Sequence, residues 1–99
     1  MRKSIIVILL AALAGVSQAA DIESGKAAAN SRCVSCHGKA GKSANPMYPN
    51  LAGQHAVYLA KQMRDFQSGK RQDPIMNAML NGVSEATIDD LAAYYSSLQ

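Results

Sequence analysis

The sequence is poor in the large side chains and paired cysteines on which small proteins usually build a stable core. It has no tryptophan, one phenylalanine and only two cysteines among 99 residues. A chain of this size buries little apolar surface and needs a further source of stability. A disulfide between Cys33 and Cys36 would close too short a loop to stabilise much. We therefore expect a bulky cofactor to complete the core, and a poorly folded chain without it.

A concentrated basic patch is also absent. The formal net charge is +3, but Arg2 and Lys3 in the first few residues account for two of these charges. The other basic residues are scattered along the chain, whereas nucleic-acid-binding domains usually carry a strongly basic patch or stripe. The sequence therefore predicts no nucleic-acid partner.

The N-terminal segment has the three parts of a secretory signal peptide. Arg2 and Lys3 form a basic start, residues 5–16 are an almost unbroken apolar run, and Ser17-Gln18-Ala19 offers small residues for cleavage. The apolar run is too short to span a bilayer comfortably. We expect residues 1–19 to be cleaved, a periplasmic location and no stable membrane span afterwards; the alternative is an uncleaved anchor.

Residues 33–37 read Cys-Val-Ser-Cys-His. Two thiols three positions apart and followed at once by a histidine are the attachment signature of a c-type haem. A redox dithiol would need a strand before the motif, and the preceding residues instead favour a helix. A structural zinc site needs four ligands, and His55 is the only other histidine, with no second cysteine pair. We predict one covalent haem c per chain, attached to Cys33 and Cys36, with His37 as an axial ligand of the iron.

Helical signals dominate the rest of the chain, so we expect an all-α fold of a few short helices wrapped around the haem. Asp21 is a plausible N-cap for a helix from Ile22 to about Ser31, and Ser84 for the last helix. A middle helix over residues 53–68 ends before Gly69, a residue suited to a helix C-terminus. Residues 38–52 and 69–82 are expected to be irregular. The predicted buried faces are Ala56, Leu59, Ala60, Met63 and Phe66 in the middle helix, and Ile88, Leu91, Ala92, Tyr95 and Leu98 in the last.

The residues themselves do not fix the second axial ligand. A methionine thioether would give a closed six-coordinate iron with a raised potential. Met63 lies on the predicted buried face, and Met47 follows His37 too closely to reach the opposite side of the ring easily. Met76 and Met79 share the second irregular stretch, and the sequence pattern does not separate them.

Several motifs in order make the chain resemble the class I bacterial cytochromes c, especially the short cytochrome c-553 type and one half of a di-haem cytochrome c-4. The resemblance implies one mono-haem cytochrome c domain over residues 20–99. It favours Met76 as the axial ligand, with Met79 as second choice, and it matches Pro49 to the proline whose carbonyl accepts the Nδ1 proton of the axial histidine. It also places Gly25 against Tyr94 where the first and last helices cross. The motifs are Cys33–Gly38, Pro49–Gln54, Tyr58–Phe66, Pro74–Met76 and Asp90–Tyr94.

A haem with both axial positions filled predicts an electron carrier rather than an enzyme. We expect a monomer that docks transiently with redox partner proteins, a donor and an acceptor, at its exposed haem edge, as in a respiratory chain. The alternatives are a haem subunit of a larger oxidoreductase, and a haem enzyme or gas-binding protein with a labile sixth ligand. An enzyme is disfavoured because no convincing acid–base histidine or arginine is available; His55 lacks any match to a ligand position.

Overall fold

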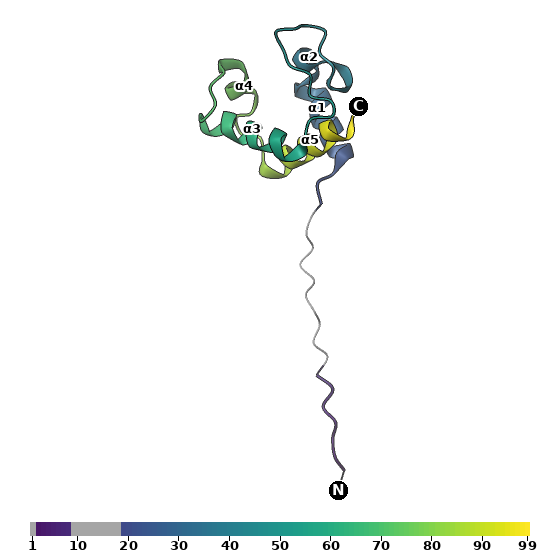
Figure 1. The fold of residues 1–99 in the computed structure, drawn as a ribbon. Helices are drawn as coiled ribbons and strands as arrows, with labels where there is room; N and C mark the ends of the chain where they lie inside the picture. The colour runs from purple at the N-terminus through teal and green to yellow at the C-terminus, as the bar shows by residue number, and fades with distance from the viewer. Residues whose placement is uncertain (1, 9–18) are drawn as a thin grey trace.

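All regular secondary structure in the described part of the chain is helical, which confirms the all-α prediction. The structure is a computed structural model that describes residues 2–8 and 19–99, and no strand occurs among them. Figure 1 shows the helices gathered into one folded unit. In chain order the helices are α1 (Ile22–Arg32), α2 (Val34–His37), the 3-10 helix η1 (Lys39–Gly41), α3 (Ala56–Ser68), α4 (Pro74–Met79) and α5 (Glu85–Ser97).

The first and last helices begin at the residues that the sequence indicates. The Asp21 carboxylate accepts hydrogen bonds from the backbone N–H groups of Glu23 and Ser24, at 2.9 and 3.2 Å. The Ser84 hydroxyl accepts one from the Thr87 N–H at 3.1 Å. These side chains satisfy N–H groups that have no partner within the first turn of a helix.

Helices α1 and α5 cross in close contact at Gly25. A Cβ atom at this position would collide with the backbone carbonyl of Asp90 and would lie 2.8 Å from Cβ of Tyr94. Ordinary van der Waals contact needs more space than this, so only glycine lets the two backbones approach so closely. The predicted contact between Gly25 and Tyr94 is therefore confirmed.

The hydrophobic core forms around α5, which packs against α1 and also against α3 (Figure 1). Ile88 and Leu91 of α5 are the largest fully buried side chains. The predicted buried faces are largely confirmed, although three further residues join the core and three of the predicted ones are only partly buried. Tyr94 is buried beside Tyr95, and Leu80 and Val83 join the core from the segment before α5. Ala56, Met63 and Leu98 are partly buried against it.

The two segments expected to be irregular contain short helices, so that expectation was wrong in part. Residues 69–82 include α4, because Asp73 caps a first turn that Pro74 enters with a suitable backbone angle. Residues 38–52 include η1. The middle helix begins at Ala56 rather than at residue 53, and His55 at its N-cap makes no side-chain capping hydrogen bond. Gly69 ends this helix in the left-handed conformation, with φ 79°, as predicted.

Much of the predicted signal peptide, residues 1 and 9–18, lies outside the described residues. The cleavage prediction therefore stays a prediction. Among the helices that the structure describes, none combines the length and the apolar character needed to cross a membrane.

Candidate haem site

The Cys33–His37 motif occupies a single helical turn directly after α1. Cys33 ends α1, where its N–H donates to the Ala29 carbonyl at 2.8 Å, and its own carbonyl accepts from the His37 N–H at 3.0 Å. Cys33 and Cys36 are both half-buried free thiols. Helix α2, which Cys33 caps, therefore fixes the spacing of the two thiols and the imidazole.

The imidazole of His37 is buried and held by one hydrogen bond. Only 7% of the residue is exposed, and its Nδ1 lies 2.9 Å from the carbonyl oxygen of Pro49. A carbonyl can only accept, so Nδ1 carries the proton and Nε2 keeps its lone pair. This is the tautomer in which an imidazole binds a metal through Nε2, and the contact is the one predicted for Pro49.

The loop that carries Pro49 is closed at its base by Gly41. The Gly41 carbonyl accepts from the N–H groups of Leu51 and Ala52 at 2.8 and 3.1 Å. A Cβ at Gly41 would lie 2.8 Å from the Ala52 nitrogen and 2.9 Å from Cδ1 of Tyr95, at a φ of +69° that favours glycine. Inside the loop, the Asn50 side chain accepts from the Ser43 N–H at 2.7 Å. These bonds fix the Pro49 carbonyl against His37.

The environment of Cys33 does not favour a thiolate. Burial raises the pKa of this thiol above its ordinary value, and the nearby Tyr95 hydroxyl and Arg32 offset only part of that effect. Burial also raises the pKa of the Tyr95 hydroxyl, so both groups stay neutral. A redox-active dithiol depends on a cysteine with a lowered pKa. Cys33 therefore does not have the lowered pKa on which a redox-active dithiol depends.

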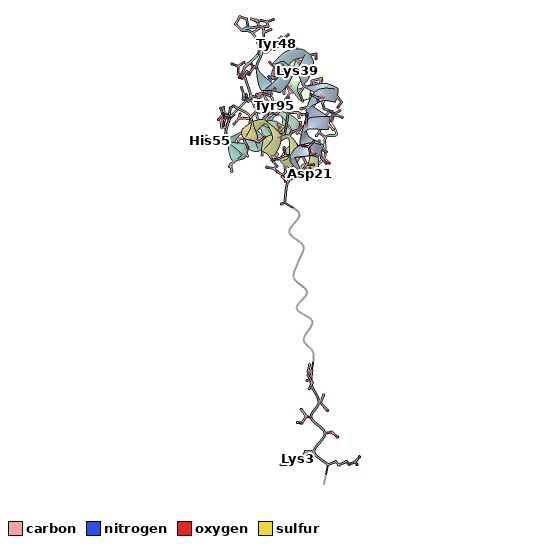
Figure 2. The ribbon with its side chains drawn as sticks, turned by 90° about the vertical axis from the view of Figure 1, so that its right-hand side faces the viewer. Lys3, Asp21, Lys39, Tyr48, His55 and Tyr95 are labelled. Carbon is pink, nitrogen blue, oxygen red and sulfur yellow. The ribbon has the colours of Figure 1, made fainter. Side chains whose placement is uncertain are left out.

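Sequence reasoning placed Tyr95 in the core but missed its place beside Cys33. No local pattern could have revealed this pairing, because it depends on how α5 crosses the end of α1. Figure 2 shows Tyr95 inside the folded unit and His55 at its edge. His55 is exposed, and it takes no part in the arrangement around His37.

The methionines differ in how they face the core. Met76 and Met63 are partly buried and pack against it. Met79 is 39% exposed and Met47 is 82% exposed. Helices α2 and α4 stand apart on the same side of α5 (Figure 1). The structure thus does not bring Met76 into contact with His37, and two ligands on opposite faces of one ring would not touch.

The donor set fits a covalently bound haem. Two half-buried thiols one helical turn apart match the two attachment points, and a buried imidazole whose Nδ1 faces the Pro49 carbonyl leaves Nε2 for the iron. A partly buried thioether on a separate element can serve the other side of the ring.

The known proteins that this chain resembles in sequence and structure are cytochromes c. Residues 22–99 match the family model described as Cytochrome c. Cytochrome c4 of Thiocapsa roseopersicina is 40% identical over 84 residues, which are 85% of this chain and 43% of that protein. Cytochrome c-554(548) of Halomonas halodenitrificans is 44% identical over 68 residues, which are 66% of this chain and 82% of that protein.

A solved structure of cytochrome c4 from Acidithiobacillus ferrooxidans superimposes with a TM-score of 0.76 at 35% identity. The aligned region covers 85% of this chain and 53% of that one. The chain therefore spans about half the length of the cytochromes c4 that it matches. The fold is that of a class I cytochrome c, and the predicted cofactor, covalent haem c, is confirmed by the family. The chain belongs to the cytochrome c family, with residues 22–99 as its haem-binding domain.

Proposed function

We propose that the protein is a periplasmic electron carrier with His37 and Met76 as the axial ligands of its haem iron. Cys33 and Cys36 would form the thioether bonds to the haem, and Pro49 would orient His37. When bound, the haem supplies a one-electron couple between ferrous and ferric iron. The chain's residues hold the ligands, exclude water from the core and leave no open position for a substrate.

The observation that carries this proposal is the hydrogen bond from His37 Nδ1 to the Pro49 carbonyl. A buried imidazole with its Nδ1 proton committed at 2.9 Å has only Nε2 left to bind a metal. The bond also raises the basicity of Nε2, which strengthens a metal–nitrogen bond.

Burial favours Met76 over Met79 as the second ligand. Met76 packs against the core, while Met79, one helical turn later, is 39% exposed. A thioether that faces the core is closer to any group that completes that core. Met79 is therefore the second choice.

Two filled axial positions support an electron carrier rather than a haem enzyme. The relatives named cytochrome c4 and cytochrome c-554(548) fit this role. We propose that residues 1–19 direct export and are then removed, so that the haem is attached outside the cytoplasm. The carrier would be a monomer that docks weakly with its electron donor and acceptor, since small interfaces suit rapid turnover.

The test compares the variants Met76→Ala and Met79→Ala in the purified holo protein. An intact methionine–iron bond gives a weak near-infrared absorption band in the ferric state. We expect the wild type and Met79→Ala to show this band, and Met76→Ala to lose it and to bind carbon monoxide readily when reduced. A band that survives in Met76→Ala but disappears in Met79→Ala would move the ligand to Met79. A wild type without the band would contradict ligation by a methionine, and if its reduced form also bound carbon monoxide readily it would contradict the electron-carrier proposal.

A further inference from the structure

Helix α4, which carries Met76, has little packing to hold it in place. It is six residues long, and none of its residues is fully buried. Helices this short are only marginally stable on their own, because the cost of nucleation is spread over few hydrogen bonds. Something outside the helix must therefore fix its position.

One such contact is made by the side chain of Asn77, the residue directly after Met76. Its Nδ2 group donates to the Phe66 carbonyl near the end of α3 at 2.7 Å and to the Arg71 carbonyl at 3.1 Å. Its Oδ1 atom accepts from the Asp73 N–H at 2.9 Å. The Nδ2 group thus joins α4 to the end of α3 and to the turn between them. The Oδ1 atom holds the residue at which α4 begins.

A second amide holds the other end of α4. Nε2 of Gln67 in α3 donates to the carbonyl of Leu80 at 2.9 Å and to that of Val83 at 2.6 Å. Leu80 and Val83 are buried in the core directly after α4. The segment that carries Met76 is therefore tied to α3 on both sides by side-chain amides.

We infer that Asn77, with Gln67, is a positioning residue that holds the Met76 thioether in place for the iron. This inference rests on the proposed ligation by Met76. Methionine is flexible, with three rotatable side-chain bonds, so the backbone that carries it must supply the order. When the amide bonds are lost, α4 samples positions in which the thioether is away from the iron, and a competing ligand binds more easily.

The experiment measures how readily imidazole displaces the methionine in the ferric holo protein. The readout is the imidazole concentration that removes half of the near-infrared band. Asn77→Asp keeps the size of the side chain and its acceptor oxygen, but it cannot donate to Phe66 and Arg71. We expect about tenfold less imidazole to suffice for Asn77→Asp and for Asn77→Ala, and a smaller change in the same direction for Gln67→Ala.

The matched control is Asp21→Ala, which removes the cap of α1 and lowers stability without touching α4. We expect it to leave the half-displacement concentration unchanged. The inference would be overturned if Asn77→Asp and Gln67→Ala kept the wild-type half-displacement concentration. It would also be overturned if Asp21→Ala, at an equal loss of stability, lowered that concentration as much as the Asn77 variants do. If the wild type lacked the near-infrared band, the proposed ligation by Met76 would be contradicted. If the wild type showed the band but the Asn77 variants needed as much imidazole as the wild type, only the positioning role would be overturned.

Discussion

The two sides of the proposed haem site are held in different ways. On the His37 side, the ligand is buried, follows two thiols on one helical turn and donates to a loop that is closed at Gly41. On the Met76 side, the ligand sits on a six-residue helix without a fully buried residue. Hydrogen bonds that amide side chains donate, and that the Asp73 carboxylate accepts, hold that helix in place.

This difference assigns separate tasks to the two sides. The His37 side is fixed by packing and by the backbone, and with a haem attached at the proposed Cys33 and Cys36 it would anchor the cofactor. The Met76 side depends on a few hydrogen bonds, each of which contributes only about 1 kcal/mol to stability. Changes in ligand strength and potential should therefore arise mainly on the Met76 side, while losses of fold stability should arise mainly where α1 crosses α5.

The largest effect is expected from Gly25→Val at that crossing. The added side chain would collide with Asp90 and lie against Tyr94, and we expect a loss of about 3 kcal/mol in the free energy of unfolding of the holo protein. Urea unfolding of the holo protein measures it. Ala27→Val, at an exposed position of the same helix, is the control and should cost only about 0.5 kcal/mol. Equal losses in the two variants would contradict the close crossing.

A smaller effect is expected from removing the caps of α4, which carries Met76, and of α5. The Asp73 carboxylate accepts from the N–H groups of Ile75 and Met76, both at 3.0 Å. Asp73→Ala and Ser84→Ala should each lower the free energy of unfolding by about 1 kcal/mol. Only Asp73→Ala should also let imidazole displace the methionine more easily, because Ser84 caps α5 and not α4. If both variants changed imidazole binding alike, the Met76 side would not depend specifically on the hydrogen bonds of α4.

The smallest effect concerns the pH dependence of α1. Hydrogen bonds from Ser24 and then Glu23 hold the pKa of the Asp21 carboxyl below its ordinary value of 3.8. A lowered pKa in the folded state means that Asp21 stabilises the fold above the ordinary value, and that this contribution is lost as the pH falls through the lowered pKa. NMR titration of the Asp21 carboxyl should give a value below 3.8. Asp21→Asn should remove this part of the pH dependence, and a pKa above 3.8 would contradict the cap.

The elements that local signals define were predictable from the sequence. Asp21 and Ser84 begin their helices as expected, because a capping side chain acts on the three residues that follow it. The Cys33–His37 motif was also recognised from the sequence. The hydrogen bond between His37 and the Pro49 carbonyl was predicted only through the resemblance to the cytochromes c. Helix α4 was missed because six residues are too few to show a helical period.

The roles of Asn77 and Tyr95 depend on tertiary contacts and leave no mark in the sequence. Asn77 reaches Phe66, eleven positions earlier, and it can do so only after the turn from α3 to α4 has formed. The choice between Met76 and Met79 has the same origin, since both are methionines of one short helix. Burial separates them, and burial depends on how α4 is held against the core.

The most direct test of the account is a spectroelectrochemical titration of the purified holo protein with the near-infrared band followed throughout. The account predicts a single one-electron transition at a raised potential, with the band present in the oxidised form and no binding of carbon monoxide to the reduced form. A ferric protein without the band whose reduced form binds carbon monoxide would contradict ligation by His37 and Met76, and with it the function of a simple electron carrier.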